Sequence, residues 1–424
     1  MRDGRMVLMV LLFSLSLQAG EPVDSIYCVG SRKFSDPSPR VGFNFRPTSF
    51  SLPNAYWLAI ASSDVYLEKN LILQEIGRWG FTNNVDPLSD DHLFFMDENR
   101  EAKLDILGQP LVFRYADSQA FWAENKDGVL IVFRGTTPGN IADALTDANR
   151  FPVPFRNLGE VHEGFLAGLK ILWNSIYART RQLRKRDFKE KYALLDHFAG
   201  IPEDQWPATW DSLKDWKIPD SGKSAFLNEW KRINESTTLP PEEKEEKHDE
   251  LLKFLNIHWI TRQKPIWLAG HSLGAGLATI TAAQLMYEGF NVGGLYTYGS
   301  PRVGSDKFAH LVEVKANEMG IREQLARFIN QYDVVARMPP LTGVVLNGTL
   351  DGKWKEIGRT KYFTGKTPES GSVELVTDAL ELFELPQFPS QMLEHRADWF
   401  LDHSMKHYIK KLEHIVFGSP ANCS

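Results

Sequence analysis

Residues 265–276 read Pro-Ile-Trp-Leu-Ala-Gly-His-Ser-Leu-Gly-Ala-Gly and join a short apolar run to a stretch of small residues. The run Ile266–Ala269 is typical of a buried strand, and Ala275–Ala283 has the composition of a helix. A sharp turn between them brings the neighbouring backbones close together, which explains a glycine on each side of the turn. This strand, turn and helix make Ser272 a candidate nucleophile. The alternative is a tight turn before a closely packed helix.

The bulk composition is that of a globular protein with a large core. The chain has 424 residues, of which 43% are hydrophobic. This allows one large α/β domain with decorations, or two domains. The net charge of −6 leaves no basic excess to neutralise phosphates. We therefore expect no nucleic-acid partner.

The N-terminus has the layout of a secretory signal peptide. Two arginines precede an apolar run from Met6 to Phe13, and Gln18-Ala19-Gly20 lead into a polar segment. We predict a signal peptide over 1–20 with cleavage near Ala19 or Gly20, and an uncleaved anchor is the alternative. No later stretch is apolar for long enough to span a bilayer. We expect a secreted or periplasmic protein.

Cysteines and sequons give weaker indications. Cys28 and Cys423 lie near the two ends of the mature chain, where a disulfide or two unpaired thiols would both fit. Neither cysteine has neighbours that suggest a metal site, and we predict no metal. Glycosylation sequons begin at Asn234, Asn347 and Asn422.

The order of predicted elements favours an α/β protein. After a Pro-, Ser- and Arg-rich surface segment over 21–50, strands are predicted at Leu111–Tyr115, Ala120–Ala123 and Val129–Phe133, as an antiparallel lead-in to a larger sheet. Further strands and helices alternate after Ser272. We therefore predict a mixed, mostly parallel sheet flanked by helices over 51–424.

A helical insertion or cap is predicted at about 178–256. It opens with a basic run, ends in a mixed-charge stretch and contains Trp206, Trp210, Trp216 and Trp230. Basic residues with tryptophan would suit a lipid-facing surface. A small helical subdomain, with the tryptophans as its own core, is the other interpretation. We favour the second, because runs of charge usually form a solvated face.

A serine nucleophile needs a general base, and the base needs an acid that orients it. After this kind of turn, the partners follow in the order Ser, Asp or Glu, His. Asp333 comes just after a predicted strand, and His403 stands at a turn before a helix. We predict Ser272, Asp333 and His403 as the triad. Spacing alone leaves Asp306 and His395 as alternatives.

The strand Val129–Phe133 ends in Arg-Gly-Thr-Thr. If it stops at the same sheet edge as Ser272, backbone N–H groups there could bind a substrate carbonyl, and Thr136 is the candidate. The alternative is that this stretch only closes a strand and caps a helix. His162 could also be a base, but it precedes Ser272 and stands near a helix start, where we expect it to pack or to support the site indirectly.

Five motifs in one order make the chain resemble the class 3 lipase family of α/β-hydrolase-fold serine esterases. The resemblance spans about Asn54 to Leu412, including a histidine end with Tyr408 that is similar to bacterial-type members. The motifs are Val132-Phe133-Arg134-Gly135-Thr136, Val161-His162-Glu163-Gly164-Phe165, Gly270-His271-Ser272-Leu273-Gly274-Ala275-Gly276-Leu277-Ala278, Tyr298-Gly299-Ser300-Pro301-Arg302-Val303-Gly304 and Asp333-Val334-Val335 with Pro339-Pro340.

The resemblance implies Ser272 as nucleophile, Asp333 as orienting acid and His403 as base, with an oxyanion hole at the N–H groups of Leu273 and Thr136. It implies no metal or cofactor. The expected activity is that of a triacylglycerol lipase or carboxylesterase. The alternatives are a phospholipase A1, an esterase of soluble esters, and a non-catalytic lipid- or partner-binding protein. The segment Ile141–Asp147 differs from the family's usual Trp-Leu-Thr-Asp, where the lid begins.

Overall fold

The computed structural model describes most of the chain from residue 43 to residue 417. The described residues are 27–29, 32–34, 43–79, 81, 93–97, 119–135, 152–187, 189–202, 205, 220–252, 263–331, 333–338, 342–345, 348–351, 354–364, 373–377 and 401–417. The predicted signal peptide, the predicted strand Leu111–Tyr115 and Cys423 lie outside these ranges. Within the described ranges, no helix is both long and apolar enough to cross a bilayer.

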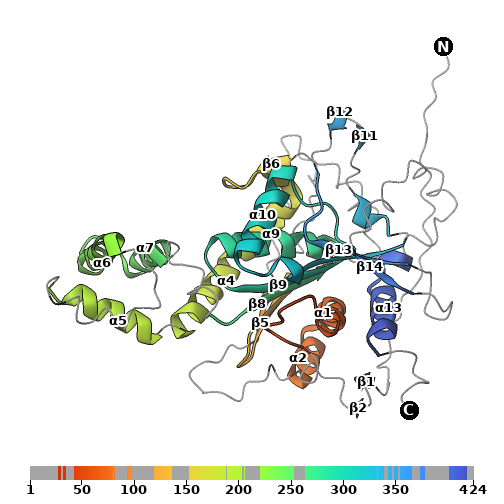
Figure 1. Cartoon of the computed structure of the whole chain (residues 1–424), viewed down its shortest axis with the longest axis horizontal. Coiled ribbons are helices and arrows are strands. Elements are labelled where there is room, and N and C mark those ends of the chain that lie inside the picture. Colours follow the sequence, from red (N-terminus) through yellow and green to blue (C-terminus); the bar gives the residue numbers. More distant parts are fainter. Residues whose placement is uncertain are drawn as a thin grey trace, which may run out of the picture.

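An eight-stranded mixed sheet forms the centre of the molecule (Figure 1), in the order β14-β13-β10-β9-β8-β5-β4-β3. The strands are β3 (Leu93–Asp97), β4 (Gln119–Glu124), β5 (Val129–Phe133), β8 (Ile266–His271), β9 (Val292–Tyr298), β10 (Leu325–Asn330), β13 (Arg359–Phe363) and β14 (Leu375–Thr377). The five strands from β5 to β13 are parallel, and β3, β4 and β14 are antiparallel at the two edges. The predicted α/β fold class is confirmed.

The central strands are buried along their whole length and are mostly apolar. Every residue of β5, β8, β9 and β10 is buried. Mostly apolar, buried runs of this kind are typical of parallel strands that are covered on both faces.

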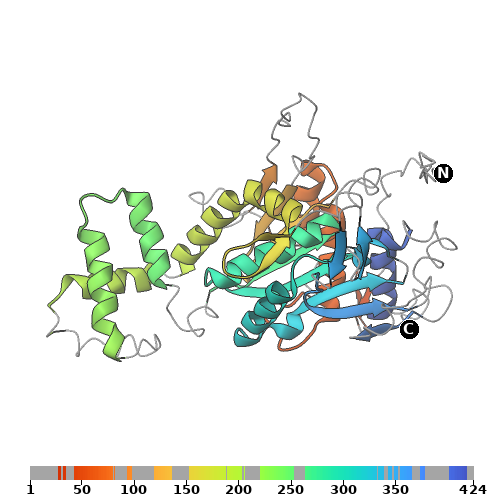
Figure 2. The ribbon, with the colours of Figure 1, turned by 90° about the horizontal axis from the view of Figure 1, so that it is seen from above.

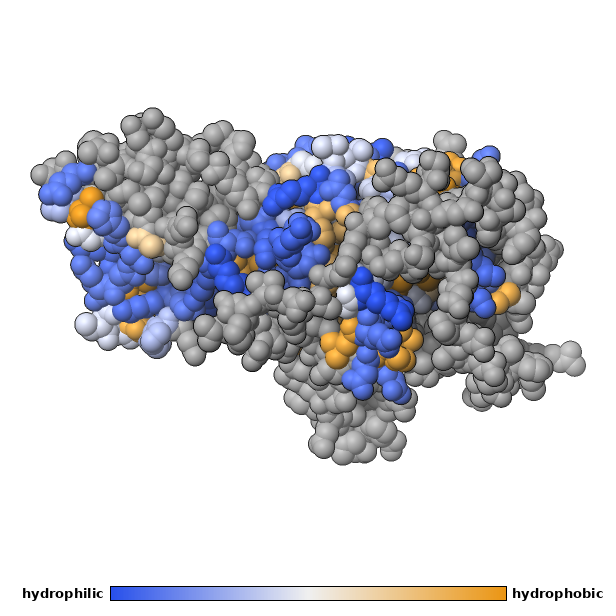
Figure 3. Space-filling view, turned by 90° about the horizontal axis from the view of Figure 1, so that it is seen from below, coloured by the Kyte–Doolittle hydropathy of each residue, from blue (hydrophilic) through white to orange (hydrophobic). Residues whose placement is uncertain are grey.

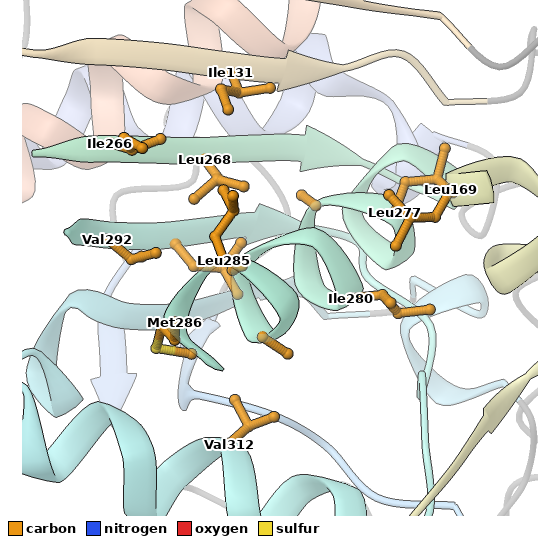
Figure 4. Packing of buried hydrophobic residues seen from close by; sticks show 14 of the residues in the cluster. Ile131, Leu169, Ile266, Leu268, Leu277, Ile280, Leu285, Met286, Val292 and Val312 are labelled. Atoms are coloured by element: carbon orange, nitrogen blue, oxygen red, sulfur yellow. The ribbon is translucent and has the colours of Figure 1, made fainter. Parts of the chain in front are cut away.

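Helices cover both faces of the sheet. One face carries α4 (Glu163–Asp187), α9 (Leu273–Tyr287) and α10 (Asp306–Glu318), and the other carries α1 (Leu52–Asp64), α2 (Lys69–Arg78) and α13 (Met405–Phe417). Figure 4 shows side chains of β5, β8 and β9 meeting those of α9, with Val312 of α10 beyond. Because α9 is apolar all round, it lies in the middle of this layer.

Short elements complete the described structure. They are the strand pairs β1 (Tyr27–Val29) with β2 (Arg32–Phe34), β6 (Pro152–Pro154) with β7 (Glu160–His162), and β11 (Thr342–Val345) with β12 (Gly348–Asp351), and the single turns η5 (Arg322–Gln324) and η6 (Val335–Arg337).

The predicted insertion contains α5 (Lys189–Gly200), α6 (Asp220–Glu235) and α7 (Pro241–Leu252). These helices lie at the far end of α4, away from the sheet (Figures 1 and 2). Helix α4 itself runs without a break through residue 178 to Asp187. Trp230 is buried, stacks on the ring of His248 at 4.0 Å and donates to Asp196 at 2.9 Å. It therefore packs inside the insertion, whose described surface in Figure 3 is mostly hydrophilic.

An ionic cluster around one buried carboxylate connects the end of α4 to the sheet. The carboxylate of Glu124, at the end of β4, has a side chain only 3% exposed and pairs with Arg186 and with Lys264, the latter at 2.7 Å. The backbone N–H of Lys264 donates to Asp187 at 2.7 Å. Because Lys264 comes two residues before β8, the chain leaves the body of the molecule for the insertion, and returns from it, at the end of the sheet where β8 begins.

Candidate active site

Ser272 forms the turn between β8 and α9. Its φ of 59° and ψ of −128° are unusual for a residue with a side chain and carry strain that the surroundings must hold. A Cβ atom at Gly270 would lie 2.4 Å from the oxygen of Gly274, and one at Gly274 would lie 2.3 Å from the oxygen of Phe133. Both glycines are therefore required by close backbone approach. The N–H of Ser272 donates to the oxygen of Tyr298 at 3.0 Å.

Asp333 lies just beyond the end of β10 and is completely buried. Its Oδ1 accepts hydrogen bonds from the N–H groups of Val335 at 2.9 Å and Ala336 at 3.3 Å. Its Oδ2 accepts the hydroxyl of Tyr408 at 2.7 Å. Both oxygens lie 3.0 Å from Nδ1 of His403.

The surroundings keep Asp333 ionised. Burial by itself would raise the pKa of this carboxyl, but the charge and hydrogen bond of His403 and the hydroxyl of Tyr408 outweigh burial and lower the pKa below its ordinary value. Burial, and next the negative charge of Asp333, raise the pKa of Tyr408. Tyr408 therefore remains protonated and donates.

His403 lies just before α13 and is buried. Because the carboxylate of Asp333 only accepts hydrogen bonds, Nδ1 of His403 carries a hydrogen and Nε2 keeps the lone pair in the neutral ring. Nε2 has no hydrogen-bond partner among the residues that the structure describes. The imidazole thus presents a free basic nitrogen. Its ring lies 4.4 Å from the ring of His271, the residue that precedes Ser272.

The two alternatives left open by sequence spacing fare differently. Asp306 is the first residue of α10, its side chain is 78% exposed, and it faces Lys355 at 3.9 Å. It is thus separate from the buried pair of Asp333 and His403. His395 lies outside the described residues. The structure therefore brings together the predicted acid and base beside the turn that holds Ser272.

The predicted oxyanion hole is partly described. Leu273 is the first residue of α9, so its N–H is among those at the helix N-terminus that lack a partner within the helix. Thr136 lies outside the described residues. Its neighbour Gly135 is described, and a Cβ atom built on it would lie 3.1 Å from Cβ of Ser272. The end of β5 therefore reaches the turn.

His162 occupies a packing position, as expected from the sequence. It is buried in β7, with its ring 4.6 Å from that of Phe165 and 5.7 Å from that of Trp354. Its Nδ1 accepts the N–H of Gly164 at 3.1 Å. Across the described part of the chain, no three His, Cys, Asp or Glu side chains gather as a metal site would require.

Sequence reasoning missed two residues beside the site. The hydroxyl of Tyr66 lies 3.1 Å from Nδ1 of His271, and Nε2 of His271 lies 2.6 Å from the carbonyl oxygen of His403. His271 stands inside the Gly-His-Ser-Leu-Gly motif, so its position was visible. Tyr66 lies far from the motif in sequence, and no local pattern distinguishes it from a core tyrosine.

Comparison with known proteins supports the family resemblance. The model of the lipase (class 3) family matches residues 241–343. A secreted mono- and diacylglycerol lipase of Fusarium solani is 45% identical over 18% of this chain and 20% of its own length. A triacylglycerol lipase of Nicotiana tabacum is 27% identical over 50% of this chain and 38% of its own length. A phospholipase A1 of Oryza sativa is 36% identical over 21% of this chain and 22% of its own length.

The alignments thus span between a fifth and two fifths of these relatives. The region of this chain that matches the family, residues 241–343, contains β8, Ser272, α9, β9, β10 and Asp333. The resemblance to the class 3 lipase family is confirmed over this region.

Proposed function

We propose that this chain, whose residues 241–343 match the class 3 lipase family, is a serine ester hydrolase that forms an acyl-enzyme on Ser272. The observation that carries the proposal is the pairing of His403 with the buried, ionised Asp333. It leaves Nε2 of His403 unpartnered among the described residues, beside the strained turn of Ser272.

In the proposed acylation step, Nε2 of His403 takes the proton of the Ser272 hydroxyl while the hydroxyl oxygen of Ser272 attacks the ester carbonyl carbon. The carboxylate of Asp333 stabilises the imidazolium that forms. When the tetrahedral intermediate collapses, the carbon–oxygen bond to the alcohol breaks, and the proton on His403 moves to the leaving oxygen. The products are a free alcohol and an acyl group on Ser272.

Deacylation repeats these steps with water as the nucleophile. His403 takes a proton from water, the resulting oxygen attacks the acyl carbon, and the proton returns to Ser272 as the acid leaves. The negative oxygen in both steps would accept hydrogen bonds from the N–H of Leu273, at the N-terminus of α9, and of Thr136.

We assign acylglycerols as the substrate class, which the names of two aligned relatives support. The phospholipase A1 among the relatives keeps phospholipid esters as the second candidate. Hydrolysis rates on dioleoylglycerol, triolein and phosphatidylcholine, presented in equal detergent micelles, separate the two. Faster release of fatty acid from phosphatidylcholine than from the acylglycerols would reverse the assignment.

We also propose that the chain is exported by its first 20 residues. The apolar run after two arginines supports this proposal, and one aligned relative is named a secreted lipase. N-terminal sequencing of protein recovered outside the cytoplasm should give a start close to Glu21. An N-terminus at Met1 would contradict cleavage.

Labelling by a fluorophosphonate probe tests the nucleophile. The probe should label the wild-type protein and leave Ser272→Ala unlabelled. Ser62→Ala is the matched control, because Ser62 is a buried serine of α1 whose hydroxyl has no partner in the described part of the chain. It should keep full labelling. Equal labelling of Ser272→Ala and wild type would remove Ser272 as the nucleophile, and an unlabelled, inert wild type would favour the binding-protein alternative.

A further inference from the structure

A line of hydrogen bonds joins Tyr66 to the backbone of His403 through His271. The side chains of His271 and His403 are buried, and that of Tyr66 is partly buried. Nε2 of His271 lies 2.6 Å from the carbonyl oxygen of His403. Because a carbonyl oxygen only accepts, Nε2 of His271 must carry the hydrogen.

The direction of the next hydrogen bond follows from this tautomer. With its hydrogen on Nε2, the neutral ring of His271 has a lone pair on Nδ1. The hydroxyl of Tyr66, 3.1 Å away, must therefore donate to Nδ1. The oxygen of Tyr66 also lies beside the backbone of Gly135. A Cβ atom at Gly135 would lie only 2.4 Å from this oxygen, which confirms how closely the two groups approach.

These contacts connect two separate parts of the candidate site. Gly135 stands immediately before Thr136, the residue predicted to bind the substrate oxygen, and His403 is the proposed base. The middle of the line, His271, directly precedes Ser272 in the turn. We propose that Tyr66 and His271 are positioning residues, which fix the backbone of His403 relative to the turn and to the end of β5. This inference rests on the proposed function.

His271 suits this role only while it is neutral. Its ring lies 4.4 Å from that of His403, so a positive charge on it would oppose the imidazolium that His403 forms during the reaction. Burial, and next the charge of His403, lower the pKa of His271 to about 3. The titratable and charged groups around it are His403, Asp333, Tyr66, Tyr408 and, over the ring of Tyr66, Arg134.

The substitution Tyr66→Phe removes the hydroxyl and keeps the ring. Losing one hydrogen bond should lower kcat about 3- to 10-fold on a soluble p-nitrophenyl ester, with KM unchanged within about twofold. The freed lone pair on Nδ1 would accept a proton at a higher pH than in the wild type, but a rise of about one unit from a pKa of about 3 leaves His271 neutral near pH 7. The kcat/KM profile should therefore keep its acid limb, and the loss should appear in kcat.

Two substitutions at His271 test the other hydrogen bond. The amide nitrogen of His271→Gln can replace Nε2 as donor to the carbonyl of His403, whereas His271→Ala has no donor. The Gln variant should retain more of the wild-type kcat than the Ala variant. Equal losses in both would contradict the proposed contact.

Tyr296→Phe is the matched control for Tyr66→Phe. Tyr296 is buried, and its hydroxyl accepts a backbone N–H, that of Ser51 at 3.0 Å, outside the catalytic machinery. This variant should lose stability without any loss of kcat. If Tyr66→Phe keeps the wild-type kcat, or if Tyr296→Phe lowers it equally, the positioning role is wrong.

A measurement independent of ester hydrolysis separates this inference from the proposed function. Nitrogen-15 NMR of labelled histidines, assigned with His271→Gln, should show His271 neutral with its hydrogen on Nε2 across pH 5–9. In Tyr66→Phe the resonances of His403 should shift. A hydrogen on Nδ1 of His271 would overturn the inference even in an active enzyme. The expected spectrum in a protein that no fluorophosphonate labels would reject the proposed function alone.

Discussion

The buried carboxylate of Asp333 shows at residue scale how the site is held. It accepts hydrogen bonds from two backbone N–H groups, from the hydroxyl of Tyr408 and from His403. A carboxylate with so many donors can remain charged away from water. The hydroxyl of Tyr408 has a second role, because it also accepts the N–H of Asn330 at 3.0 Å.

Tyr408→Phe should therefore destabilise the protein in a pH-dependent way. At pH 7 we expect the free energy of unfolding to fall by about 1–3 kcal/mol, since the variant loses a donor to Asp333 and leaves the N–H of Asn330 unpaired. The pKa of Asp333 is lowered in the folded state, so its stabilising effect is present above the unfolded pKa and is lost as the pH falls through the folded pKa. Urea titrations at pH 7 and about pH 3 should show a smaller difference from wild type at the lower pH.

Tyr298→Phe provides the comparison for that measurement. Tyr298 is buried as well, but its hydroxyl donates to the neutral carbonyl of Ala55. Its substitution should cost stability equally at both pH values. A pH-independent cost for Tyr408→Phe would show that its bond to Asp333 contributes little.

Sequence reasoning at this scale is strongest where chain order and turn chemistry constrain a residue. The flanking glycines predict the turn at Ser272, and the structure places Asp333 in contact with His403, a pair that the order Ser, Asp or Glu, His allows. The role of Tyr66 could not be predicted from the sequence, because its partner is a ring nitrogen 205 positions away and nothing in its own segment indicates that contact.

At the scale of elements, the strands were more predictable than the long helix α4. Predicted strands at 120–123 and 129–133 match β4 and β5, because short apolar runs between turn residues leave few alternatives. In contrast, a composition change near residue 178 suggested a boundary, and α4 continues to Asp187. The basic residues there are good helix formers, so a change in charge does not end the helix.

Glu124 should secure the last turns of α4. Glu124→Gln removes the buried charge that pairs with Arg186 and Lys264, and both partners are partly exposed. We expect a loss of about 1–2 kcal/mol, below the cost of a fully buried pair. Hydrogen exchange should rise in the C-terminal half of α4 and stay unchanged in α9.

Glu245→Gln is the control for this measurement. Glu245 pairs with Lys185 of α4, and its side chain is 46% exposed. A similar effect of both substitutions would contradict a special role for Glu124.

At the scale of the whole molecule, the position of the insertion limits what it can do. The insertion joins the body beside Lys264, before β8, whereas Ser272 follows the end of β8. These two points lie at opposite ends of β8, and a strand of six residues separates them by about 20 Å. The sequence could not reveal this, because the entry and exit of an insertion depend on where distant strands begin. The interpretation of this region as a cap over the site is therefore disfavoured.

Deleting the insertion should accordingly leave the chemistry intact. In a variant with residues 189–252 replaced by a short Gly-Ser linker, α4 and the Glu124 cluster remain, and Trp230 is removed together with the helices it packs against. We expect unchanged kcat and KM on a soluble ester, and unchanged flotation with liposomes, because the described surface of the insertion is mostly hydrophilic. Thermal unfolding of the variant checks that the body is folded. Loss of flotation with retained soluble-ester activity would instead make the insertion the lipid-binding part of the molecule.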